Sequence, residues 1–146
     1  MGLRAPSQDG KAYLVSTSVA RLFAPGHGSE KALGKVVALP FGKPLGVRDL
    51  ATLPDGRLLV LAGPAQEQNL PYGLFVVDSL QDNQTEFRTI RPEGLGTISI
   101  EVGKDKVGKA EALAVLDVSS DILRVLVPFD GPRNGGPREY RIPLKK

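Results

Sequence analysis

Short runs of β-branched residues and leucine recur along this chain, and turn-forming residues separate them. The runs lie at residues 12–16, 35–41, 47–53, 57–62, 73–78, 86–90, 97–102, 111–116, 122–127 and 139–144. Turn signals stand at Pro54-Asp55-Gly56, Gly63-Pro64, Asp82-Asn83, residues 94–96, residues 119–121 and Gly131-Pro132. Runs of this length between turn residues are typical of short strands. The best helical candidates, residues 16–24 and 29–33, are too short to carry an apolar stripe through several turns. We therefore predict an all-β chain of about ten strands.

Two stretches of the chain resemble each other in the order of their parts. Residues 47–51 lead through a Pro-Asp-Gly turn into residues 58–64, which close on Ala-Gly-Pro. Residues 110–114 lead through a Ser-Ser-Asp turn into residues 122–132, which close on Asp-Gly-Pro. Leu50 and Leu113, which correspond in the two stretches, are 63 positions apart. Repeated four-stranded units are typical of β-propellers, and a single β-sandwich or barrel with similar hairpins is the alternative.

The length of the chain limits how many such units it can hold. A third, weaker copy begins at residues 3–6, and at about 40–50 residues per blade the 146 residues supply about three blades. We therefore expect residues 1–146 to form a single domain, a β-propeller-like arc of about three four-stranded blades that is part of a larger propeller. Closed propellers have roughly four to eight blades. The uncovered faces and edges of an arc favour either missing blades or a homo-oligomer as partner.

Composition excludes several other classes. The chain has no cysteine, which removes disulfide frameworks, cysteine-ligated zinc and thiol nucleophiles but does not fix the compartment. Its longest apolar runs, residues 36–41 and 58–65, fall far short of the roughly 20 residues of a membrane-spanning helix. Residues 1–6 show no signal-peptide pattern, so we expect a soluble protein without a membrane partner. The 19 basic residues are scattered among 16 acidic ones, a pattern that predicts no nucleic-acid binding.

Three ordered motifs suggest a family. Gly2-Leu3-Arg4-Ala5-Pro6 stands before Asp9-Gly10-Lys11-Ala12, residues 45–50 lead to residues 58–64, and Lys109-Ala110-Glu111-Ala112-Leu113 follows. With this combination the chain resembles the DUF3616 family, bacterial proteins of unknown function. The resemblance covers most of the chain and implies a β-propeller. It is to the later part of such proteins, which implies that earlier blades are missing. Where the family often has Glu-Gly-Leu, this chain has Glu111-Ala112-Leu113.

Charged residues open each repeated unit, where the inner strand of a blade begins beside the central channel. We predict that these residues converge on a ligand-binding site, and the candidates are Arg4, Arg48, Asp49, Lys109 and Glu111. Guanidinium and ammonium groups beside carboxylates either bind an anionic ligand or pair with one another. Three carboxylates, those of Asp49, Glu111 and Asp130, offer oxygen ligands for calcium, although no loop has EF-hand spacing.

Two classes of function fit these residues. The first is a ligand- or protein-binding and scaffolding module. The alternative is a metal-dependent hydrolase of a phosphoester, ester or lactone, in which Arg48 or Lys109 stabilises negative charge. The fold alone does not decide between them. His27, the only histidine, lies in a glycine-rich loop without a G-x-S-x-G elbow, which favours the binding module. Tyr72, in a Leu-Pro-Tyr-Gly turn, is the tyrosine that we expect to be exposed.

Overall fold

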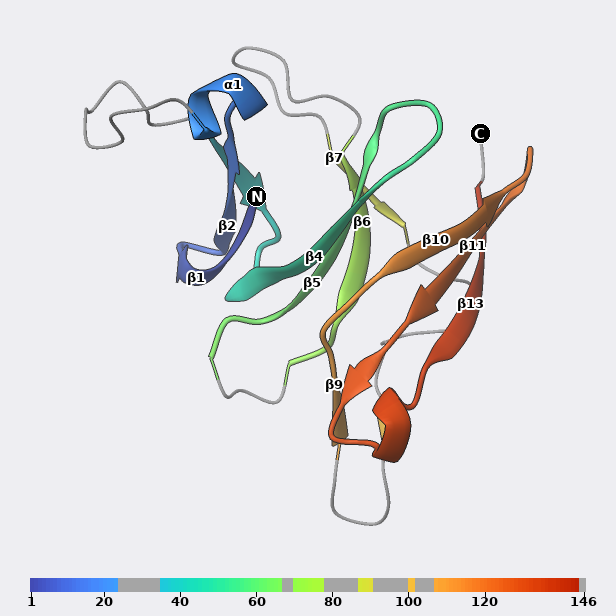
Figure 1. Ribbon diagram of the computed structural model, residues 1–146. Helices are drawn as coiled ribbons and strands as arrows, with labels where there is room; N and C mark the ends of the chain where they lie inside the picture. Colours follow the sequence, from blue (N-terminus) through green and yellow to red (C-terminus); the bar gives the residue numbers. More distant parts are fainter. Residues whose placement is uncertain (24–34, 67–69, 78–86, 91–99, 102–106, 145–146) are drawn as a thin grey trace.

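The chain is all-β over the residues that its computed structural model describes, which are 1–23, 35–66, 70–77, 87–90, 100–101 and 107–144. The strands form small antiparallel sheets, and none of the sheets in these ranges closes into a barrel. Three sheets follow one another in chain order across Figure 1, from blue through green to red. None of the helices in the same ranges is long and apolar enough to cross a membrane.

The middle sheet has four strands in the order β4-β5-β6-β7. Their bounds are β4 (Leu45–Thr52), β5 (Leu58–Pro64), β6 (Gly73–Val77) and β7 (Phe87–Ile90). Along β5, Leu59 and Leu61 belong to one buried cluster, whereas Val60 and Ala62 belong to another. Side chains alternate between the faces of a strand, so both faces of this sheet are covered. This explains why β5 is continuously apolar rather than alternating.

The N-terminal sheet covers one face of the middle sheet. It consists of β1 (Gly2–Gln8), β2 (Lys11–Ser16) and β3 (Lys35–Pro40), in that order, and β2 leads into the short helix α1 (Val19–Leu22). Ala12 and Leu14 of β2 are buried against the middle sheet together with Val37 and Leu39 of β3. The residues between them in sequence point to the opposite face.

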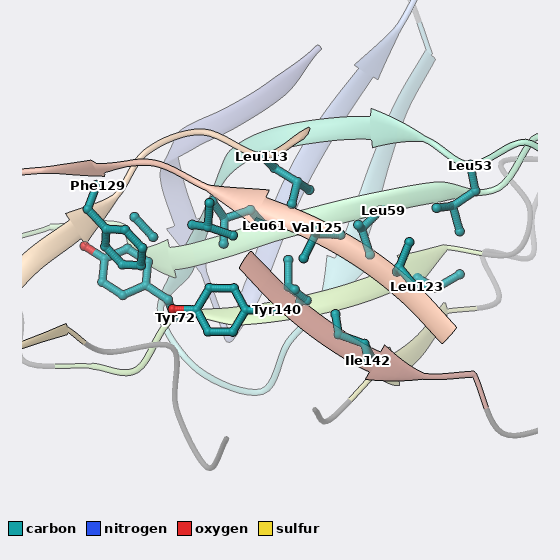
Figure 2. Close-up of a cluster of buried hydrophobic side chains, with 14 residues drawn as sticks. Leu53, Leu59, Leu61, Tyr72, Leu113, Leu123, Val125, Phe129, Tyr140 and Ile142 are labelled. Atoms are coloured by element: carbon teal, nitrogen blue, oxygen red, sulfur yellow. The ribbon is translucent and has the colours of Figure 1, made fainter. Parts of the chain in front are cut away.

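The C-terminal sheet covers the other face of the middle sheet. Its strands are β10 (Ala114–Val118), β11 (Ile122–Val127) and β13 (Arg138–Pro143), in that order. Figure 2 shows the apolar side chains of β11 and β13 against those of β5, with Phe129, Tyr72 and Tyr140 together at one end of the cluster. A small sheet, β12-β9-β8, contains β8 (Ile100–Glu101), β9 (Val107–Ala110) and β12 (Phe129–Asp130), and a 3-10 turn, η2 (Arg133–Gly135), precedes β13.

Several details differ from the sequence-based expectations. Only the middle sheet has four strands among the described sheets, and the others have three. The strand expected at 111–116 begins at Ala114, so Glu111-Ala112-Leu113 lies outside the strands while the corresponding residues 48–50 lie inside β4. Strand β1 was not apparent from periodicity because it carries Arg4, Ala5 and Pro6 and has an irregular register. The 29–33 helix candidate, His27 and the glycines at 94 and 96 lie outside the described residues.

Candidate functional site

A bulge in β4 positions two of the predicted site residues. The register between β4 and β5 passes from Val47 opposite Ala62 to Asp49 opposite Leu61, so Arg48 is an extra residue. Neighbours in a regular strand point to opposite faces, but a bulge re-aims the side chains beside it. Val47 packs toward the N-terminal sheet, whereas Arg48 and Asp49 both bond to the segment that leads into the C-terminal sheet.

Arg48 is the most buried charged side chain of the site, at 2% exposure, while its partner Glu111 is 37% exposed. Its Nη1 donates to Oε1 of Glu111 at 2.8 Å, and its Nη2 donates to the carbonyl oxygen of Pro64 at 2.6 Å. The guanidinium carbon lies 5.7 Å from the centre of the Tyr72 ring, within the range of a cation–π interaction. Charge-assisted bonds of this kind are stronger than neutral ones. Arg48 therefore joins the end of β5 to residue 111.

Asp49 bonds to the same segment from the neighbouring position. Its Oδ2 accepts a hydrogen bond from the backbone N–H of Leu113 at 2.7 Å, and its Oδ1 accepts one from the N–H of Leu50 at 2.8 Å. Residues 111–113 lie outside the strands, so a side chain rather than a strand ladder accepts the bond from Leu113. We call Arg48, Asp49, Glu111 and Leu113 the clasp, because their bonds hold the middle sheet to the entry of the C-terminal sheet.

Tyr72 was expected to be exposed, and this was wrong, because its side chain is 7% exposed and belongs to the core. The reason lies at Gly63, on the adjoining strand. A Cβ at Gly63 would overlap the Tyr72 ring and lie 3.3 Å from Cγ of Arg48. Glycine inside a strand often marks such a close approach. Gly63-Pro64, expected as a turn, is the end of β5, and this glycine was the signal that sequence reasoning did not use.

The other predicted site residues lie on other strands, outside the clasp. Arg4 is exposed on β1, and its backbone lies against Gly46. Lys109 and Asp130, both exposed, stand opposite each other on β9 and β12. The structure thus joins Arg48 and Glu111 directly, with Asp49 beside them. No set of three or more His, Asp or Glu side chains in the described ranges is arranged to hold a metal ion. Calcium binding through Asp49, Glu111 and Asp130 stays a prediction.

The buried phenols of this region predict a loss of stability at alkaline pH. Burial raises the pKa of Tyr72 above its usual 10.0; Arg48 opposes this rise and Glu111 adds to it. Burial likewise raises the pKa of Tyr140. The unfolded phenols ionise first, so the stability that they contribute is complete below about pH 10 and is lost as the pH rises through the folded pKa values. Urea midpoints measured from pH 8 to pH 11 should fall less steeply for Tyr72→Phe than for the unsubstituted chain. Parallel curves would contradict this role of Tyr72.

A comparison with known protein families agrees with the motifs in the sequence. The family model described as "Protein of unknown function (DUF3616)" matches residues 1–140. That range contains the whole of the N-terminal and middle sheets and the clasp. No curated protein and no solved structure matches the chain.

Proposed function

This chain belongs to the DUF3616 family, whose function is unknown, and from that premise we propose that it is a propeller-type module with a binding or scaffolding role. The clasp is the observation that carries the proposal. Arg48 bonds to Glu111 and to a backbone carbonyl, and both carboxylate oxygens of Asp49 accept backbone N–H groups. These groups are already bonded within the chain, where they hold two sheets together, and this favours a binding or scaffolding module over catalysis by the same groups.

The arrangement of the sheets supports the propeller-type part of the proposal. In a propeller, antiparallel blades follow one another in chain order and pack around a common centre. Here the first strands of neighbouring sheets meet. Gly2 of β1 lies against Val47 of β4, and the clasp joins β4 to the entry of β10. The proposal treats residues 1–146 as one domain that is part of a larger propeller. Further sheets of that propeller would pack on the outer faces of the N-terminal and C-terminal sheets.

The alternative function, metal-dependent hydrolysis, requires calcium or another divalent ion at the carboxylates, and a melting experiment separates the two. Under the scaffold role no ion binds here, so we expect the melting temperature to stay within about 1 °C when EDTA or millimolar calcium is added. A bound ion present at 100 times its dissociation constant would instead add about 2.7 kcal/mol to the free energy of unfolding. Under the scaffold role, Asp49→Asn and Glu111→Gln lower the melting temperature equally with and without calcium. The melting temperatures are measured by circular dichroism.

Asp117→Asn is the matched control, since Asp117 is an exposed carboxylate on β10. Its melting temperature should equal that of the unsubstituted chain. A calcium-dependent rise that Asp49→Asn and Glu111→Gln abolish, but Asp117→Asn keeps, would overturn the scaffold role. Hydrolysis of phosphoester, ester and lactone probes by the unsubstituted chain, lost in the same two variants, would establish the alternative.

A further inference from the structure

Asn134 lies in the turn between β12 and β13, directly before Gly135. The residue is exposed, and its backbone is left-handed, with a φ of 59° and a ψ of 29°. Asparagine tolerates this region better than most residues with a side chain, and Gly135 and Gly136 continue it with positive φ values. Within the described residues no hydrogen bond holds the side-chain amide of Asn134. The amide can therefore turn toward the main chain that follows it.

An asparagine amide can react with the backbone nitrogen of the next residue. Cγ of the amide is an electrophilic carbon, and attack by that nitrogen closes a five-membered ring. Two groups of one chain react with a large advantage over separate molecules once they reach the geometry of attack. A following glycine has no Cβ to crowd the approach. Asn134 is the only asparagine of the sequence that glycine follows, since Asn69 precedes leucine and Asn83 precedes glutamine.

The turn restrains this reaction only weakly. Among the described residues one backbone bond closes the turn, from the N–H of Gly135 to the carbonyl oxygen of Pro132 at 3.1 Å. Ring closure requires that this bond break and that the backbone of Asn134 rotate about its ψ. Hydrogen bonds of the 3-10 type have poor geometry, and exposed turns open locally at little free-energy cost. The reaction therefore requires the opening of one turn and not the unfolding of the sheets.

Asp55, which precedes Gly56 in another exposed turn, shows by contrast what makes Asn134 reactive. Both carboxylate oxygens of Asp55 are bonded, because Oδ1 accepts from the backbone N–H of Arg57 at 3.1 Å and Oδ2 accepts from its Nε at 2.8 Å. These bonds lower the pKa of Asp55, so its carboxyl group is ionised at neutral pH. A carboxylate resists attack because it has no neutral group to expel. The unbonded amide of Asn134 can expel ammonia.

We propose that Asn134 is a self-modification site, at which the chain converts the residue to aspartate or isoaspartate without an enzyme. The nitrogen of Gly135 gives up its proton and bonds to Cγ of Asn134. The bond from Cγ to Nδ2 breaks, and Nδ2 takes up a proton and leaves as ammonia. Water then opens the cyclic imide at one of its two carbonyl carbons. Opening at one carbon gives aspartate, and opening at the other gives isoaspartate.

Either product changes this end of the C-terminal sheet. A carboxylate in place of the neutral amide lowers the formal net charge of the chain from +3 to +2. Isoaspartate also adds one carbon to the main chain between β12 and β13. β13 pairs with β11 along its whole length, whereas β12 pairs with β9 only at Phe129 and Asp130. We therefore expect β12 to shift, and with it Phe129, which is 2% exposed in the core.

Peptide mapping by mass spectrometry tests the proposal on the purified 146-residue chain, kept folded at physiological temperature and pH. The peptide with Asn134 should gain the mass of an amide turned into an acid, in two chromatographic forms, before the peptides with Asn69 and Asn83 do. Its rate should be within about tenfold of the rate in guanidinium chloride, because a single hydrogen bond contributes little net stability. The matched variant is Asn134→Gln, whose ring would have six members. It should show no gain at residue 134 over the same time, and circular dichroism should show it folded.

Four results would overturn the proposal. No gain at Asn134 in the folded chain, while the chain in guanidinium chloride reacts, means that the turn blocks ring closure. Protection well above about tenfold means that the reaction requires unfolding beyond the turn. Equal rates at Asn69 or Asn83 remove the role of the following glycine. A gain at residue 134 that Asn134→Gln keeps excludes the five-membered imide. None of these results bears on the clasp, which contains no residue of this turn.

Discussion

Replacing Gly46 by alanine should cost about 3 kcal/mol of unfolding free energy, or roughly 10 °C in melting temperature, the largest loss expected from adding one methyl group. A Cβ at this position would overlap the carbonyl oxygen of Arg4 and lie 2.7 Å from its carbonyl carbon and 2.9 Å from its Cα. These are backbone atoms, so no side-chain rotation relieves the overlap. β1 would have to move away from β4, which would open the contact between the N-terminal and middle sheets. Urea unfolding and thermal melts measure the loss.

Gly56→Ala is the control for Gly46→Ala. Gly56 has a φ of +85° and no atom within 4 Å of an added Cβ, so its substitution tests backbone strain without overlap. We expect a loss of about 1 kcal/mol there. A loss at Gly46 no greater than the loss at Gly56 would contradict the close approach of β1 to β4.

The sequence predicts the strands well where burial determines the pattern. The bounds 122–127 agree with β11, whose alternating residues Leu123, Val125 and Val127 are all buried on one face. Strand β5 is recognisable because both of its faces are buried. By contrast, β1 depends on contacts with β2 and β4 rather than on its own apolar pattern, so periodicity could not reveal it.

The sequence predicted residues of the candidate site but not the bonds that they make within the chain. The repeat placed Arg48 and Glu111 at equivalent positions, with Asp49 next to Arg48, and the structure joins Arg48 to Glu111 and Asp49 to the N–H of Leu113. A regular strand would have sent Arg48 and Asp49 to opposite faces, and only the bulge in β4 puts both on the side of the C-terminal sheet. No local signal marks that bulge. The burial of Tyr72, by contrast, depends on its close approach to Gly63, nine positions earlier in the chain.

Arg48→Ala should be nearly as damaging as Gly46→Ala, with a loss of about 3 kcal/mol. The substitution leaves the Glu111 carboxylate and the Pro64 carbonyl without the donors that they have now, and it removes a 2% exposed side chain from beside Tyr72. The stability of Arg48→Lys should lie between that of the unsubstituted chain and that of Arg48→Ala, because a single ammonium cannot reproduce the two-pronged geometry of a guanidinium. Thermal melts and urea midpoints give the order of the three proteins.

Arg138→Ala tests whether the loss comes from the clasp rather than from positive charge in general. Arg138 is exposed at the start of β13, so its removal should leave the melting temperature unchanged within about 1 °C. In a double-mutant cycle, Glu111→Gln should cost less in the Arg48→Ala background than alone, because the partner is already gone. Equal melting temperatures for Arg48→Ala and Arg138→Ala would remove the clasp as the link between the two sheets. Additive losses in the cycle would show that the Arg48–Glu111 bond does not stabilise the contact between the two sheets, and that Asp49 alone holds residues 111–113.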